Sequence, residues 1–141
     1  MPHDPLGTLR ERARTNLFWR HLGIEVDDAR EGWVRLRVPV KDELRNAEGA
    51  PVHGGVYSAL VDTAVGGALA TMHEVSQGGV GQTTLDLNVS FIGSVSAGPI
   101  FAEGRILRRG RTIAFGEVTI TDSAGKLVAV GRATYMILPP R

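Results

Sequence analysis

A His-Gly-Gly turn at residues 53–55 precedes a long apolar segment with a single charged residue, Asp62. Between Val56 and Met72, apolar residues fall at positions that would occupy every face of a helix. A helix that is hydrophobic all round is buried within a protein. An ionised carboxylate is costly to bury without partners. The sequence therefore predicts a buried helix over residues 53–74, in which Asp62 needs a structural or functional reason.

The segments around this helix have patterns typical of one further helix and several strands. Residues 6–22 form an amphipathic pattern, ended by Gly23, with one face made of Leu9, Ala13, Leu17 and Phe18. Alternating patterns predict strands over residues 24–28, 32–40, 83–91, 100–107, 112–121 and 127–137. In the strand 83–91, one side carries Leu85, Leu87, Val89 and Phe91, and the other carries Asp86, Asn88 and Ser90. Residues 41–51 are polar and rich in turn formers, so they should form a loop.

These elements predict an α+β fold in a single domain of residues 1–141, because this length suits one core. An antiparallel sheet curled around the apolar helix satisfies both hydrophobic patterns. The chain has no cysteine, which excludes disulfides within it. No signal peptide and no apolar run of about 18 residues is visible, so we expect a cytoplasmic location and no membrane span. The net charge of +1 gives no case for nucleic acid or a membrane surface as partner.

The start of the buried helix suits acyl-transfer chemistry. A helix N-terminus offers unpaired amides and a partial positive charge. Glycines at positions 54 and 55 let a ligand oxygen approach those amides closely. Such a site stabilises a carbonyl that acquires negative charge. Asp62 is the residue that could act with it as a base or nucleophile.

The spacing of these two parts predicts an oligomer. Gly54 and Asp62 are eight residues apart, which is roughly 12 Å along a helix axis. A reacting carbonyl needs both groups at about 3 Å, so one helix cannot supply both to the same site. Two helices packed antiparallel across a twofold axis would place Gly54 of each beside Asp62 of the other. If both residues serve one site, the chain is a homodimer at minimum.

Four segments in the same order resemble a known family. They are residues 53–62 (His-Gly-Gly-x-x-x-x-Leu-x-Asp), Asp86-Leu87-Asn88-Val89, residues 110–115 and residues 125–134, and Leu22-Gly23-Ile24 also fits. Together they make the chain resemble the hot-dog-fold acyl-CoA thioesterases, particularly the branch of phenylacetic acid degradation (PaaI-like). The resemblance covers nearly the whole chain. It implies a hot-dog fold and thioester hydrolysis without a cofactor other than the coenzyme A of the substrate. The expected assembly is a homodimer at minimum or a homotetramer, and the sequence does not decide between the two.

The resemblance also implies roles for individual residues. Asp62 matches the carboxylate that attacks the thioester or activates a water. Gly54 matches the amide that polarises the carbonyl, and His53 matches an orienting histidine. Thr84 matches a hydroxyl that holds the water. Asn46 resembles an assisting asparagine, although the loop from Asn46 to His53 is one residue longer than the family pattern.

Structural explanations for the same residues remain open. Asp62 could be bonded to a nearby backbone group or to Thr84, and His53 could only close the turn. Arg109 and Arg111 belong to a basic patch that is either a solvated hairpin or a contact for coenzyme A phosphates. The histidines at positions 3, 21 and 73 have no ligand spacing, so no metal is expected.

The main functional hypothesis is therefore an acyl-CoA thioesterase that releases a free acid and coenzyme A. One alternative is a hot-dog enoyl-CoA hydratase or dehydratase, which would need an acid–base partner for Asp62. Another is an acyl-CoA-binding module without catalysis. The sequence defines neither the acyl group nor whether Asp62 is the nucleophile or the general base.

Overall fold

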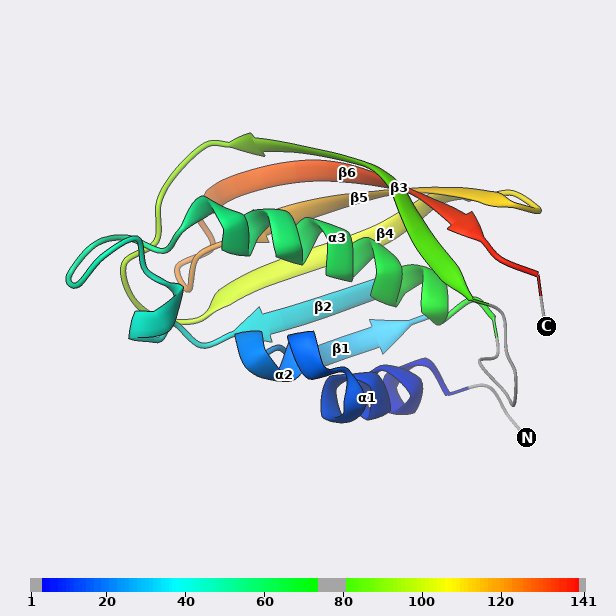
Figure 1. Cartoon of the computed structure of the whole chain (residues 1–141), viewed down its shortest axis with the longest axis horizontal. Helices are drawn as coiled ribbons and strands as arrows, with labels where there is room; N and C mark the ends of the chain where they lie inside the picture. Colours follow the sequence, from blue (N-terminus) through cyan, green and yellow to red (C-terminus); the bar gives the residue numbers. More distant parts are fainter. Residues whose placement is uncertain (1–3, 74–80, 140–141) are drawn as a thin grey trace.

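The computed structural model describes residues 4–73 and 81–139. Two helices come first, then two strands, a short 3₁₀ helix, one long helix and four further strands (Figure 1). The elements are α1 (Pro5–Thr15), α2 (Leu17–Leu22), β1 (Glu25–Arg30), β2 (Trp33–Val38), η1 (Asp42–Leu44), α3 (Gly54–Ala70), β3 (Gln82–Phe91), β4 (Ile100–Arg109), β5 (Ile113–Thr121) and β6 (Leu127–Ile137). None of the described helices is long and apolar enough to span a membrane.

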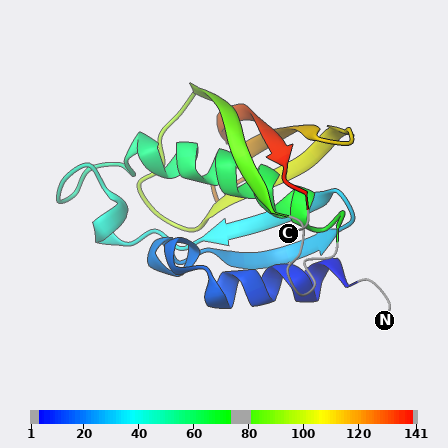
Figure 2. The same cartoon turned by 45° about the vertical axis from the view of Figure 1, so that its right-hand side comes forward.

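The six strands form one antiparallel sheet in the order β1-β2-β4-β5-β6-β3. The sheet curls around α3, and β3 crosses beside that helix (Figures 1 and 2). This arrangement leaves β1 and β3 as the two edges of the sheet. The predicted α+β fold, an antiparallel sheet wrapped around a long apolar helix, is therefore confirmed.

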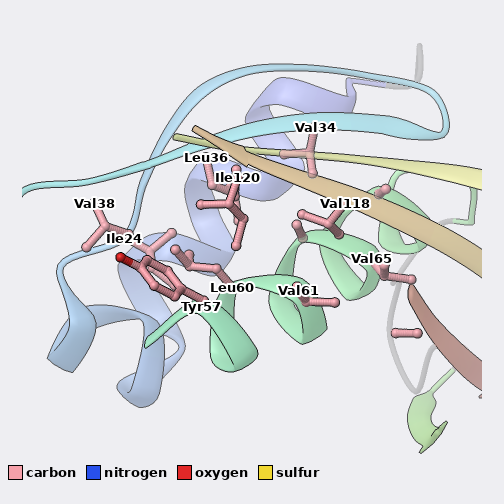
Figure 3. Close-up of a cluster of buried hydrophobic side chains, with 14 of the residues drawn as sticks. Ile24, Val34, Leu36, Val38, Tyr57, Leu60, Val61, Val65, Val118 and Ile120 are labelled. Atoms are coloured by element: carbon pink, nitrogen blue, oxygen red, sulfur yellow. The ribbon is translucent and has the colours of Figure 1, made fainter. Parts of the chain in front are cut away.

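The helix α3 forms the centre of the core, as its all-round apolar pattern predicts. Leu60, Val61 and Val65 are fully buried against side chains from the sheet (Figure 3). Glycines in three strands allow this close packing. A Cβ atom at Gly104, Gly116 or Gly131 would lie 2.6–2.7 Å from atoms of Ala64, Val65 or Val61. Side chains there would push the sheet away from the helix.

The N-terminal segment contains two helices where the sequence predicted one over residues 6–22. Asn16 separates them, because its extended backbone and its side chain cap the second helix. Its Oδ1 accepts hydrogen bonds from the amides of Phe18 and Trp19 at 3.0 and 3.1 Å. The predicted apolar face is divided as a result: Leu9 is buried, whereas Leu17 and Phe18 are 76% and 52% exposed. Gly23, with φ of 77°, ends α2 as expected.

Most other element boundaries differ from the prediction by one or two residues. The polar loop 41–51 contains the 3₁₀ helix η1, and β4 continues through Arg109 before the turn to β5. The helix α3 ends at Ala70 with Thr71 as its C-cap. The predicted continuation of the helix to His73 is therefore wrong. Glu74 and the predicted break at residues 78–79 lie outside the described residues.

The edge strand β3 turns an apolar row toward α3 without burying it. Leu87 and Phe91 pair with Ala133 and Ala129 of β6, on the inner side of the sheet. They nevertheless remain 40% and 57% exposed. Leu85 does not continue the row as predicted, because the ladder shifts register between Thr84 and Asp86.

Candidate active site

Asp62 lies in the middle of α3, and its carboxylate accepts hydrogen bonds from hydroxyl groups on two strands. Thr84 Oγ1 of β3 donates to Asp62 Oδ1 at 2.6 Å. Tyr135 Oη of β6 donates to the same Oδ1 at 2.6 Å, and it also lies 2.8 Å from the main-chain oxygen of Asp62. Thr84 and Tyr135 are direct partners in the β3–β6 ladder, so the sheet delivers both hydroxyls to one point.

The two carboxylate oxygens of Asp62 therefore differ. Oδ1 accepts two short hydrogen bonds, whereas Oδ2 accepts none from any described residue. Two donors on one oxygen fix the orientation of the carboxylate, because both hydrogen bonds weaken when their donor–hydrogen–acceptor angles depart from linear. The other oxygen is left to accept a proton or to attack a substrate. The structure thus brings Asp62 and Thr84 together, as the prediction requires.

Tyr135 is a member of this cluster that the sequence analysis did not identify. Burial raises the pKa of its hydroxyl well above the ordinary value, and the hydrogen bond to Asp62 adds to the effect. The hydroxyl consequently remains a donor at neutral pH. A buried tyrosine usually has a partner for its hydroxyl. Its place in a strand beside small residues, together with the lone buried Asp62, was the available signal.

Gly66 provides the space for Tyr135. A Cβ atom at position 66 would lie 2.6 Å from the Tyr135 hydroxyl oxygen and 3.1 Å from the ring carbon that carries it. The main-chain oxygen of Gly66 also accepts a hydrogen bond from Gln82 Nε2 at 2.7 Å. One turn of α3, from Asp62 to Gly66, thus binds to β3 and β6 through polar groups rather than through apolar packing.

A cleft of about 550 Å³ opens beside Asp62. One wall comes from α3 and the strands, and the opposite wall comes from the two N-terminal helices. The lining residues are Arg12, Asn16, Phe18, Trp19, Asp62, Thr63, Gly66, Gly81, Gln82, Thr83, Thr84 and Tyr135. A volume of this size is typical of sites for small molecules.

The N-terminus of α3 forms a second group of predicted residues. His53 is the N-cap, and its Nδ1 accepts a hydrogen bond from the Gly55 amide at 2.7 Å. The Gly54 amide donates to no group among the described residues. Gly54 is half-buried, and a Cβ atom built on it would lie 3.2 Å from Cε1 of the Phe91 ring. Of the two predicted glycine amides, the one at Gly54 is therefore available to a ligand, and the one at Gly55 is bonded to His53.

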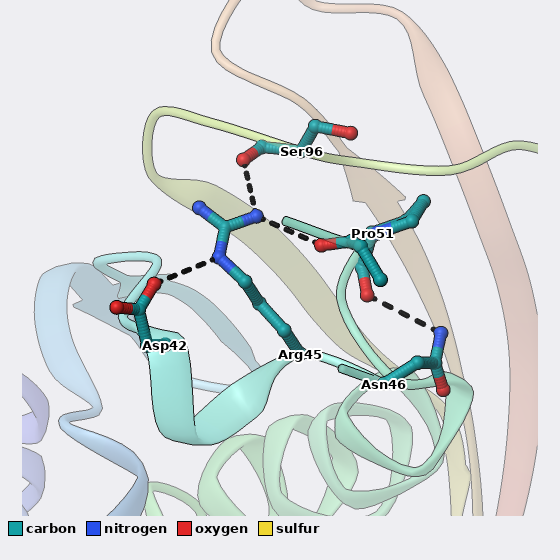
Figure 4. A network of polar contacts seen from close by, with 6 residues as sticks. Asp42, Arg45, Asn46, Pro51 and Ser96 are labelled. Carbon is teal, nitrogen blue, oxygen red and sulfur yellow. Dashed lines mark hydrogen bonds and ion pairs between the residues drawn. The ribbon is translucent and has the colours of Figure 1, made fainter. Parts of the chain in front are cut away.

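The loop before α3 is held in place by Arg45 (Figure 4). Its guanidinium group donates to Asp42 Oδ1 at 3.1 Å, Ala50 O at 3.0 Å and Ser96 O at 2.7 Å. Asn46 Nδ2 donates to Pro51 O at 3.2 Å, so this amide contributes to the shape of the loop. The carbonyl oxygen of the Asn46 side chain accepts no hydrogen bond from the described residues. These contacts fix the path of the chain into His53 and Gly54.

The predicted site residues thus occupy two separate places in one chain. Asp62 and Thr84 lie at the cleft, whereas Asn46, His53, Gly54 and Gly55 lie at the start of α3. The separation is roughly 12 Å along the helix. Arg109 and Arg111 lie at the hairpin between β4 and β5 and do not line the cleft. Within residues 4–73 and 81–139, no three acidic or histidine side chains cluster as metal ligands would.

Comparison with known proteins supplies the family context. The family described as Thioesterase superfamily matches residues 51–129, which include α3, β3, β4, β5 and the first three residues of β6. Human acyl-coenzyme A thioesterase 13 is 32% identical over 129 residues and is covered over 89% of each chain.

Solved structures have the same fold. A thioesterase from Haemophilus influenzae superposes with a TM-score of 0.83 at 28% identity, covering 94% of this chain and 90% of that one. The PaaI protein of the phenylacetic acid degradation operon of E. coli superposes with a TM-score of 0.84 at 17% identity, covering 96% and 94%. The second likeness is one of fold alone.

Proposed function

Since the chain belongs to the thioesterase superfamily, with the hot-dog fold, and is a thioester hydrolase, we propose that its substrates are acyl-CoA thioesters. The products are a free acid and coenzyme A. One observation carries the assignment of the site: Asp62 has one carboxylate oxygen anchored by Thr84 and Tyr135 and the other open beside a cleft.

In this mechanism Asp62 Oδ2 initiates the reaction at the thioester carbonyl. As a general base, it takes a proton from a water whose oxygen attacks the carbonyl carbon. As a nucleophile, it attacks that carbon itself, and water then hydrolyses the mixed anhydride. In both cases the C–S bond breaks, and the thiolate leaves and receives a proton. On the general-base route the acid takes its new oxygen from water, whereas on the nucleophilic route water attacks one carbonyl carbon of the anhydride and its oxygen enters either the acid or the Asp62 carboxylate. The Gly54 amide donates to the carbonyl oxygen as negative charge develops.

This mechanism requires two copies of the chain, because Gly54 and Asp62 of one copy are too far apart. The edge strand β3 supports a homodimer. Its outer edge has no partner among the described strands, and it exposes Leu87 and Phe91 on the side that faces α3. Long apolar edges of this kind favour pairing with another strand. Pairing there would bring a second α3 alongside the first, with Asn46, His53 and Gly54 of one copy near Asp62 of the other.

Asp62→Asn is the variant that tests the function, because it removes basicity at nearly constant shape. We expect thiol release from short, medium, long and aryl acyl-CoA esters to fall by at least about 1,000-fold in the variant. Asp86→Asn is the matched control. Asp86 is an exposed aspartate on the same strand as Thr84, on the outer side of the sheet.

Three results would contradict the proposal. They are full activity of Asp62→Asn, no thiol release by the natural chain from any ester in the panel, and hydration of crotonyl-CoA in place of thiol release. Sedimentation at assay concentrations tests the dimer separately. Monomers that retain full turnover would contradict the composite site and leave the thioesterase function standing.

A further inference from the structure

Arg12 is a cation on the wall of the cleft that the proposed reaction leaves unused. It lies in the last turn of α1, half-buried, and lines the cleft together with Asp62 and Tyr135. It forms no ion pair with any carboxylate of the described residues, unlike Arg14 on the same helix, which pairs with Glu11. Burial lowers the pKa of the guanidinium group, which reflects its loss of water.

A half-buried cation that pairs with no carboxylate of residues 4–73 and 81–139 is costly, so its retention in a cleft indicates that an anion binds there. Asp62 does not fill this role, because its Oδ1 is bonded to Thr84 and Tyr135 and it forms no ion pair with Arg12. The other residues of the same wall are the aromatic side chains of Phe18 and Trp19 and the amide of Asn16. The wall therefore combines apolar surface with one positive charge.

The position of the reacting carbonyl decides which part of a substrate can reach Arg12. The cleft of about 550 Å³ has room for a short acyl chain beside Asp62. With the thioester carbonyl at Asp62, the acyl chain extends along Phe18 and Trp19 toward the far wall. The group that meets the guanidinium is then the distal end of the acyl chain. Guanidinium groups bind carboxylates through paired hydrogen bonds.

We propose that the cleft selects acyl-CoA esters whose acyl chain ends in a carboxylate, and that Arg12 binds this second carboxylate. This inference rests on the proposed thioesterase function and adds the class of acyl group. The substrates are then mono-thioesters of short dicarboxylic acids. Hydrolysis releases the dicarboxylic acid and coenzyme A.

The experiment compares two esters with the same number of chain carbons, glutaryl-CoA and pentanoyl-CoA. The measured quantity is the ratio of their kcat/KM values from thiol release. We expect the natural chain to favour glutaryl-CoA, and Arg12→Gln to lower the ratio by about 10- to 100-fold, the value of one buried charged hydrogen-bond pair. Arg12→Lys keeps the charge and should restore part of the ratio. Arg10→Gln removes an exposed arginine from the same helix and should leave the ratio unchanged.

The outcomes separate this inference from the function on which it rests. If the natural chain releases thiol from neither ester nor from the wider panel, the thioesterase proposal fails. If it hydrolyses pentanoyl-CoA and the ratio does not change in Arg12→Gln, the function stands and the role of Arg12 is wrong. An equal loss of kcat/KM on both esters would mean that Arg12 contacts the coenzyme A part of the substrate or supports the fold. This result would also overturn the inference. Circular dichroism of each variant identifies a loss of folding.

Discussion

The hydroxyl of Tyr135 lies 2.6 Å from Asp62 Oδ1, although the two residues are 73 positions apart. Tyr135 belongs to the last strand and Asp62 to the central helix, so the contact forms only when β6 closes against α3. The high pKa of the hydroxyl, caused by burial and by the carboxylate, keeps its proton in place. In the proposed mechanism, Tyr135 acts through the orientation of Asp62, as a positioning residue and not as the base.

Tyr135→Phe should lower kcat by about 10-fold or more with little change in KM, because one of the two hydrogen bonds to Asp62 Oδ1 is lost. Steady-state thiol release measures both constants. The same substitution in an Asp62→Asn background should add almost nothing, since the residue that Tyr135 positions is no longer a base. If the two effects were additive, Tyr135 would act independently of Asp62.

Gly66→Ala should disturb the same contact from the helix side. The new methyl group would lie 2.6 Å from the Tyr135 oxygen, so the hydroxyl has to move away from Asp62. We expect about a 10-fold loss of kcat. Gly67→Ala is the control, because its methyl group would lie 3.4 Å from the nearest atom, on the Trp19 ring. Both substitutions improve helix propensity by up to about 1 kcal/mol, so propensity does not distinguish the two variants. Equal activities of Gly66→Ala and Gly67→Ala would therefore refute the role of Gly66.

The fold could be predicted from the sequence because its signals are local. The all-round apolar pattern identified α3 as the central helix, and β6 matches the predicted 127–137 at both ends. The N-terminal helix pattern was continuous, but the Asn16 side chain competes for backbone amides and divides it. Hydrophobic periodicity does not report a capping bond of this kind.

The candidate site could be predicted only in part, because it depends on long-range register. Strict alternation in β3 places Thr84 on the same side as Asp86, away from the core. The bulge at residue 85 reverses this and directs Thr84 toward Asp62. The role of Thr84 was predicted from the family resemblance and not from the periodicity of the strand. Tyr135 and Arg12 were missed because only the packed fold brings α1 and β6 to the cleft.

His73 predicts a pH dependence of stability. Burial lowers the pKa of this imidazole, and the positive charges of Arg109 and Arg12 lower it further, which outweighs the opposite effect of Gln82. As the pH falls through about 6.5, the unfolded chain therefore binds a proton that the folded chain resists. The stability due to neutral His73 is present above that pH and is lost as the pH falls toward the lower pKa of the folded state.

Chemical denaturation at pH 7.5 and pH 5.5 measures this contribution. The free energy of unfolding should decrease on acidification by a smaller amount in His73→Gln than in the natural chain. His21→Gln removes an exposed histidine and should retain the full decrease. An identical decrease in the His73 variant would show that this imidazole does not contribute to the acid sensitivity.

The composite site makes a sharper prediction about mixed dimers. Gly54→Pro removes the amide hydrogen that the mechanism requires. Proline is well tolerated at the first position of a helix, and the extended backbone of His53 suits a following proline. Gly54→Ala adds a similar Cβ atom near Phe91 and keeps the amide, so it is the steric control. Gly54→Pro and Asp62→Asn should each be inactive as homodimers, whereas Gly54→Ala should retain most of its activity.

If each site combines Gly54 of one copy with Asp62 of the other, mixing the two inactive variants should restore activity. A mixed dimer contains one site with both substitutions and one site with neither. Equal mixing with random exchange therefore leaves about one quarter of all sites intact, and thiol release should recover to about that fraction of the natural rate. If one chain supplied both residues, every chain in the mixture would carry a defective site. The mixture would then remain as inactive as its components, because subunit exchange could not reunite an intact Gly54 amide with an intact Asp62.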